Sequence, residues 1–171
     1  DVSNVDESVL ASGQVNGVNY ALSTGTNALA TFYRQDVLDE AGLEMPMEPT
    51  LESFAELAAQ VYEATGRTQD TLVGKDALRN LLRAYGLDLF NLEGDGLGFD
   101  DPQYLVRTWQ DRLDAVEAGW CLDVGETSAT TAFDAMVSDN WASWHWTNEL
   151  QAYQDGSGCD LSLACWPVPE D

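Results

Sequence analysis

Helical and extended hydrophobic periods alternate along this chain. Apolar residues recur every three or four positions after Thr50, at Leu51, Phe54, Leu57, Ala58 and Val61. This spacing predicts a helix that Thr50 caps and Gly66 ends. The apolar run 28–33 suits a buried strand, and a short helix closed by Gly42 follows it. These patterns predict a strand followed by two helices in the first half of the chain.

The same patterns predict the remaining elements. Apolar runs indicate strands at 17–22 and 161–168, and helical spacing indicates helices at 76–85, 127–136 and 148–153. Asp101 caps a further helix with Pro102 in its first position. Its apolar stripe, before Gly119, consists of Leu105, Val106, Trp109, Leu113 and Val116. Because strands and helices interleave, the predicted fold class is α/β, with helices packed on a small mixed sheet.

Residues 141–147 hold three of the six tryptophans and the only histidine. Strand alternation places Trp144 and Trp146 on one face, and Ser143, His145 and Trp141 on the other. An indole face can stack on the C–H groups of a sugar, whereas Thr147 and Asn148 can cap the next helix or bind hydroxyls. We interpret His145 as a strand residue satisfied by hydrogen bonds. We expect at least one of Trp144 and Trp146 to be exposed.

The charge of the chain is strongly acidic. It has 30 acidic and seven basic residues, a net charge of −23 and Lys75 as the only lysine. Nucleic acids and anionic membranes are therefore excluded as expected partners, because both require clustered basic residues. An extended segment would hold Cys159 and Cys165 roughly 20 Å apart, too far for a disulfide, whereas Cys121 could pair with either.

Other candidate chemistry is weaker. The segment 91–96 resembles the start of a calcium loop, but Pro102 occupies the position of the bidentate glutamate, so we favour a glycine-rich turn. With one histidine and no Cys-x-x-Cys motif, we expect neither a metal nor a cofactor. A glycoside hydrolase with an Asp/Glu pair remains an alternative. No acidic pair has a recognisable catalytic context, so we predict no catalytic residue.

One long stretch is similar to a known family. The residues from Gly17 to Leu43, with Pro46 to Pro49 and Thr50-Leu51-Glu52-Ser53-Phe54 after them, resemble a hallmark region of bacterial extracellular solute-binding proteins of family 1. These are the maltodextrin-binding-protein-like receptors of ABC sugar importers. The segments 132–146 and 160–169 resemble later parts of the same family. The resemblance implies one lobe of a class II periplasmic-binding-protein-like fold. It implies residues 1–27 as an N-terminal segment and outgoing hinge strand, 28–166 as the second lobe, and 167–171 as the return hinge.

The resemblance also implies a function. Such a receptor captures a carbohydrate by closing two lobes about a hinge, and it is not an enzyme. Its implied partners are the sugar, the ABC permease subunits and the first lobe missing here. Its implied location is periplasmic, or extracellular as a Gram-positive surface lipoprotein. The implied ligand-binding residues are Thr26, Asn27, Lys75, Asp76, Trp144, Trp146 and Asn148. Because an isolated lobe offers half of the contacts, we expect weak or undetectable sugar binding by this chain alone.

Overall fold

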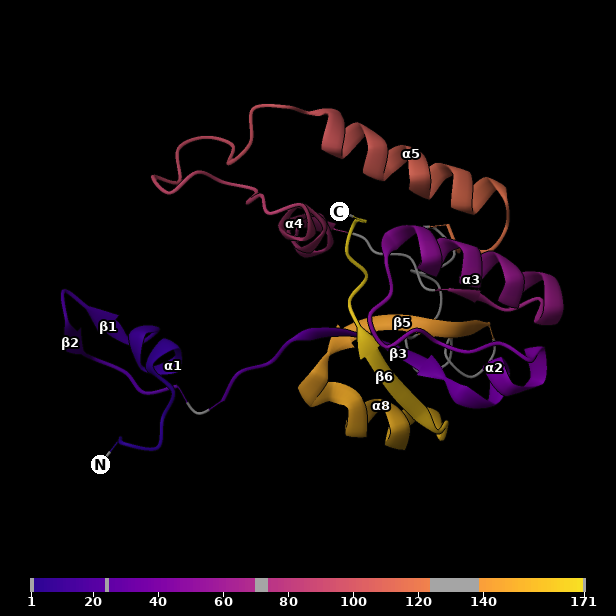
Figure 1. Ribbon diagram of the computed structural model, residues 1–171, viewed down its shortest axis with the longest axis horizontal. Coiled ribbons are helices and arrows are strands. Elements are labelled where there is room, and N and C mark those ends of the chain that lie inside the picture. The colour runs from indigo at the N-terminus through magenta and orange to yellow at the C-terminus, as the bar shows by residue number, and fades with distance from the viewer. Residues whose placement is uncertain (1, 24, 70–73, 124–138, 171) are drawn as a thin grey trace.

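The computed structural model describes residues 2–23, 25–69, 74–123 and 139–170, without the side chains of 74–77. Its centre is a four-stranded mixed sheet in the order β4-β5-β3-β6. These strands are β4 (Thr68–Gln69), β5 (Asn140–Trp146), β3 (Leu29–Arg34) and β6 (Leu161–Cys165). β3 pairs antiparallel with β5 and β6, whereas β4 pairs parallel with β5. Helix α3 (Leu51–Thr65) covers one face of the sheet and α8 (Leu150–Ser157) the other (Figure 1). The predicted α/β class is confirmed.

The N-terminal residues form a small unit beside this lobe. It consists of α1 (Glu7–Ala11) and a hairpin of β1 (Gln14–Val15) and β2 (Val18–Asn19). An extended stretch connects the hairpin to β3 (Figure 1). The strand predicted at 17–22 is therefore too long, because only two of its residues pair with the short β1.

Local capping determines where the early helices begin and end. Thr50 Oγ1 accepts a hydrogen bond from the Ser53 amide at 3.0 Å, and the Thr50 amide donates to Ser53 Oγ at 2.9 Å. This reciprocal pair fixes the start of α3. Gly42 and Gly66 end α2 (Gln35–Ala41) and α3 with φ near +70°, a conformation that glycine adopts without strain. The predicted strand at 28–33 and both predicted helices are confirmed.

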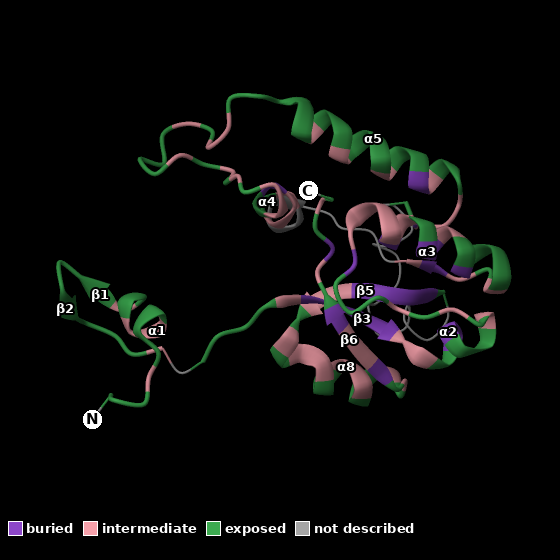
Figure 2. Cartoon of the chain, viewed as in Figure 1, coloured by how far each residue is buried: buried purple, intermediate pink, exposed green. Residues whose placement is uncertain are grey.

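The main core lies between the sheet and the helices α2 and α3. Its members are apolar residues from these elements: Tyr33, Val37, Leu38, Phe54, Leu57, Ala58, Val61, Trp141, Ala142 and Ala164. A smaller cluster on the α8 side contains Ala30, Phe32 and Leu161. The buried residues follow β3, β5 and the inner side of α3 (Figure 2). The sheet is thus apolar on both faces, as expected for a layer between helices.

Helix α5 (Gln103–Glu117) differs from its prediction. Val106, Trp109 and Leu113 of the predicted apolar stripe are 53%, 54% and 62% exposed. The less exposed side of the helix carries Leu105, Val116 and the buried Ala115, and the exposed guanidinium of Arg107 binds Glu52 of α3. The apolar stripe therefore marks the packed side of the helix only in part. Its start also differs, since Asp101 Oδ1 accepts from the Gln103 amide and Pro102 is the cap position.

The remaining predicted elements have mixed outcomes. Helix α4 (Gly74–Ala84) agrees with the prediction for 76–85. The segment 91–96 is a turn, as predicted, in which Asn91 Oδ1 accepts from the amides of Gly94 and Asp95. The final strand is shorter than predicted, although Val168 still bridges to Thr50. The helix predicted at 127–136 lies outside the described residues.

Two further findings concern the described part of the chain. Cys121 is buried, Cys159 half-buried and Cys165 exposed, and all three are thiols. Within the described ranges, no helix has both the length and the apolar character needed to cross a bilayer.

Candidate functional site

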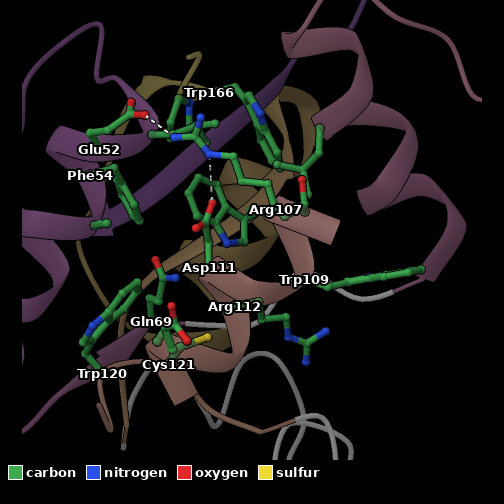
Figure 3. A pocket seen from close by; sticks show the side chains of 18 of the residues that line it. Glu52, Phe54, Gln69, Arg107, Trp109, Asp111, Arg112, Trp120, Cys121 and Trp166 are labelled. Carbon is green, nitrogen blue, oxygen red and sulfur yellow. Dashed lines mark hydrogen bonds and ion pairs between the residues drawn. The ribbon is translucent and has the colours of Figure 1, made fainter. Parts of the chain in front are cut away.

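A pocket of about 520 Å³ opens between α3, α4, α5 and the ends of β5 and β6. Its lining is unusually aromatic: Phe54, Tyr85, Trp109, Trp120, Trp144 and Trp166. The pocket is also lined by polar side chains, most of them from α5, together with Glu52 of α3 and Gln69 of β4 (Figure 3). The volume is within the range of small-molecule sites in proteins.

Trp144 and Trp166 form a continuous aromatic wall with Phe54. The Trp144 ring centroid lies 4.8 Å from that of Phe54 and 4.8 Å from that of Trp166. Trp144 is half-buried, so it belongs to the core edge and also lines the pocket. Trp166 comes directly after β6 and precedes the buried Pro167. The ends of two adjacent segments thus hold the indoles in fixed orientations.

Trp141 does not lie on the side of His145, as strand alternation predicted. It is fully buried and stacks on Phe54, with centroids 5.6 Å apart and planes 21° apart. The reason is an irregular register with β4, in which Thr68 and Gln69 face Asn140 and Ala142. Trp141 is the extra residue of this bulge, and a bulge turns a side chain to the opposite face. The alternation is regular again from Ser143 onward.

An ion group joins α3 to α5 at the pocket. Arg107 Nη2 donates to Glu52 Oε1 at 3.1 Å, and Arg107 Nε lies 3.8 Å from Asp111 Oδ2 (Figure 3). Burial raises the pKa of Asp111, with Arg107 acting in the opposite direction. Glu52 Oε2, Gln69 Oε1 and Trp166 Nε1 are buried without a hydrogen-bond partner in the described structure. Such unsatisfied atoms cost about 1–3 kcal/mol each, so a ligand that pairs with them gains binding energy.

Most of the other predicted site residues lie at one end of the two central strands, where β3 begins and β5 ends; this end of the sheet is called the edge below. The Ala28 amide donates to Thr147 Oγ1 at 3.2 Å, and the Thr147 amide donates to the Ala28 carbonyl at 2.9 Å. This pairing joins the start of β3 to the end of β5. It brings together Thr26, Asn27, Trp146 and Asn148, which are all exposed.

Two predictions concern the helices next to this edge: the capping role of Thr147 and Asn148, and the binding role of Lys75 and Asp76. Neither Thr147 nor Asn148 caps the next turn by its side chain, because the Trp146 amide donates to Glu149 Oε2 at 3.2 Å instead. Lys75 and Asp76 lie in the first turn of α4, but their side chains are outside the described residues. Among the predicted residues whose side chains the structure describes, only Trp144 lines the pocket.

Sequence reasoning missed several pocket residues. Trp166 could have been found, since an aromatic residue directly after a strand and before proline points to a strand end. The pair of Glu52 and Arg107 had no local signal, because 55 positions separate the two residues. Gln69 lies in a strand of only two residues, which is too short to give a recognisable hydrophobic pattern.

His145 lies in an arrangement that superficially resembles a hydrolase triad. Its Nε2 is 2.7 Å from Ser143 Oγ, and its Nδ1 is 3.8 Å from Glu149 Oε2. However, Ser143 is only 2% exposed, so a substrate carbonyl could not reach its hydroxyl. The imidazole packs against Phe32 and Tyr153, and burial lowers the pKa of His145 to about 4. The predicted role of His145 as a hydrogen-bonded strand residue is confirmed.

Comparison with solved structures identifies the fold. An extracellular solute-binding protein of family 1 from Alicyclobacillus acidocaldarius matches 99% of this chain and 44% of its own, with a TM-score of 0.86 and 24% identity. This chain has the fold of one lobe of an extracellular solute-binding protein. The fold class and resemblance predicted from the sequence are thereby confirmed.

Other similarities agree with this fold. The GacH receptor of Streptomyces glaucescens, solved unliganded and with acarbose, covers 99% of the chain and 45% of its own, with a TM-score of 0.77 and 23% identity. An arabinooligosaccharide-binding protein of Halalkalibacterium halodurans is 28% identical over 81 residues, which are 46% of this chain and 18% of that protein. No protein-family model matches the chain. The chain spans less than half the length of each of these proteins.

Proposed function

We propose that this lobe belongs to the carbohydrate-binding component of an ABC transporter and captures an oligosaccharide between two lobes. The observation that carries the proposal is the aromatic wall of Trp144, Trp166 and Phe54 beside unpaired buried polar atoms. A sugar has apolar C–H faces for the indoles and hydroxyls for the polar atoms.

The similar proteins support an oligosaccharide as the ligand class. One is named for binding an arabinooligosaccharide, and another was solved with acarbose. The predicted alternative, a glycoside hydrolase with an Asp/Glu pair, has no support from these relatives. We propose that the lobe binds its ligand without chemical conversion.

We further propose that the edge with Thr26, Asn27, Trp146 and Asn148 faces the other lobe. Residues 1–27 would lead out of the first lobe, 28–166 would form the second lobe, and 167–171 would return through the hinge. The link between Ala28 and Thr147 supports this arrangement, because it places the entry to β3 beside the end of β5. Lys75 and Asp76, at the start of α4, would contribute from the same cleft.

The proposed partners follow from this arrangement. They are the oligosaccharide, the first lobe of the same receptor and the ABC permease subunits in the membrane. The proposed location is the periplasm or the outer cell surface, with lipoprotein attachment in a Gram-positive source. The net charge of −23 is unsuitable for nucleic acid, which is a polyanion.

Titration of this chain with maltotriose and arabinotriose, followed by tryptophan fluorescence, tests the proposal. For this chain alone we expect a Kd in the millimolar range or a change too small to detect, because a single lobe offers about half of the contacts of the proposed cleft. No response to any neutral oligosaccharide, even when this chain is joined to the first lobe of its receptor, would contradict sugar binding. Micromolar affinity for this chain alone, measured by calorimetry, would contradict the need for two lobes.

A further inference from the structure

The ion group between α3 and α5 gives the pocket a distinctive charge pattern. The carboxylates of Glu52, Asp111 and Asp114 line it together with the guanidiniums of Arg107 and Arg112. Arg107 already binds Glu52 at 3.1 Å and lies 3.8 Å from Asp111. A ligand anion would therefore have to compete with two fixed carboxylates for this guanidinium.

The unpaired atoms of the pocket require a particular ligand chemistry. Glu52 Oε2 and Gln69 Oε1 are buried acceptors, and Trp166 Nε1 is a buried donor. A hydroxyl donates and accepts, so a set of hydroxyls can pair with all three atoms. An ionised carboxylate or phosphate only accepts, so it cannot satisfy the two acceptors and is repelled by Glu52.

We propose that this pocket selects uncharged sugar units and rejects units that carry a carboxylate or phosphate, with Glu52 as the specificity-determining residue. Arg107 is a positioning residue that fixes Glu52 for hydrogen bonding to sugar hydroxyls. This inference rests on the proposed function, since it concerns which sugars the same site accepts. It goes further because the fold and the aromatic wall alone would accept neutral and acidic sugars equally well.

The geometry explains why Glu52 has the larger role. Its Oε1 atom is engaged by Arg107, whereas its Oε2 atom is buried and unpaired. One oxygen of the carboxylate is thus oriented by Arg107, and the other has an unmet hydrogen-bonding capacity that a small side-chain rotation would turn toward a ligand hydroxyl. A ligand carboxylate beside Glu52 would meet a like charge at close range and be repelled, an effect that salt would weaken because the Glu52 side chain is 42% exposed. We expect an anionic sugar to bind about tenfold more weakly than its neutral counterpart.

The test compares maltotriose with the same trisaccharide oxidised to a carboxylate at its terminal C6 position. A parallel pair uses arabinotriose and a carboxylate-bearing arabinotriose, and tryptophan fluorescence of this chain gives each Kd. The Glu52→Gln variant keeps the size and one acceptor of the side chain but removes its charge. We expect its preference for the neutral sugar to fall to about threefold. In Arg107→Gln we expect weaker binding of the neutral sugar and a retained preference.

Arg83→Gln is the matched control. Arg83 pairs with Asp88 at 3.2 Å, both side chains are more than half exposed, and neither lines the pocket. This variant should leave both affinities and their ratio unchanged. Thermal unfolding of each variant verifies that it is folded before its binding is measured.

The outcomes separate the two proposals. If no neutral oligosaccharide binds to this chain, or to this chain joined to the first lobe of its receptor, the proposed function fails and the selectivity with it. If neutral and oxidised sugars bind equally, the selectivity alone is overturned. If Glu52→Gln keeps the tenfold preference, Glu52 does not determine it. A reduced preference in Glu52→Gln with an unchanged preference in Arg83→Gln supports the inference.

Discussion

The two ends of β5 carry tryptophans in opposite environments. Trp141, at the start of the strand, is fully buried against Phe54, whereas Trp146, at its end, is 43% exposed. Both residues belong to one strand of seven residues. Residue type and membership of the same strand therefore do not determine which tryptophan is buried in the core.

Neighbouring structure makes the difference. At the start of β5, a bulge against β4 turns Trp141 toward α3, where apolar side chains surround it. At the end, β4 no longer pairs with the strand, and the chain turns at Thr147 toward α8. Trp144 lies between these extremes and contributes to both core and pocket. The start of β5 thus contributes to the core, whereas its later residues contribute to the proposed binding site.

The largest expected effect is on the buried end. Trp141→Ala removes a fully buried indole that stacks on Phe54 and should lower the free energy of unfolding by about 3–5 kcal/mol. Trp146→Ala should lower it by less than about 1 kcal/mol, because nearly half of that side chain is already in water. Urea denaturation measures both. Equal losses would remove the distinction between the two ends.

His145, on the opposite face of β5, gives the next largest effect. Its pKa is about 4 in the folded protein and 6.5 when exposed, so the unfolded chain binds the proton more readily. The stabilising contribution is complete above pH 6.5 and is lost as the pH falls toward 4. The loss reaches up to about 3 kcal/mol.

The comparison of wild type with His145→Gln isolates this effect from the many carboxylates. The difference in their unfolding free energies, measured by urea denaturation from pH 7 to pH 4, should fall as the pH is lowered. A difference that stays constant over this range would show that His145 titrates normally.

The pocket tryptophan beyond β6 should affect binding more than folding. Trp166→Phe keeps an aromatic ring beside Trp144 but removes the unpaired Nε1 donor. We expect oligosaccharide affinity to fall by about 1 kcal/mol, close to fivefold, with little change in stability. Fluorescence titration and thermal unfolding provide the two readings. Trp146→Ala, at the strand end, is the comparison, and a larger loss there would move the main contact from the pocket to the edge.

The smallest expected effect concerns the link at the open end of β5. Thr147→Val removes the hydroxyl that accepts from the Ala28 amide at 3.2 Å and keeps the shape of the side chain. Stability should fall by about 1 kcal/mol. Hydrogen exchange should also increase at the Ala28 amide, whereas amides in the middle of β3 stay protected. Unchanged exchange at Ala28 would mean that this bond does not join the strands.

Much of the lobe could be predicted from local sequence. The capping pair Thr50 and Ser53 and the glycines after α2 and α3 act within a few residues, so their patterns are readable. The extended run 28–33 is apolar because helices cover both of its faces. Trp144 was also predicted as a candidate contact, and it lines the pocket.

What could not be predicted depends on contacts between distant segments. The burial of Trp141 follows from its register with β4, about seventy positions earlier. The exposure of Trp109 and Leu113 in α5, and the ion pair that joins Arg107 of this helix to Glu52 of α3, also depend on segments far apart in the sequence. In both cases the local hydrophobic pattern is insufficient, because the environment of each side chain depends on a segment distant in the sequence.

The most direct measurement is an oligosaccharide titration of the uniformly ¹⁵N-labelled chain, followed through its six indole N–H signals. The signals of Trp144 and Trp166 should shift saturably with a neutral trisaccharide, because both indoles line the pocket. The signal of Trp141 should stay in place, since its ring is fully buried in the core. If Trp144 and Trp166 do not shift at saturating sugar, or shift no more than Trp141, the pocket is not a carbohydrate site.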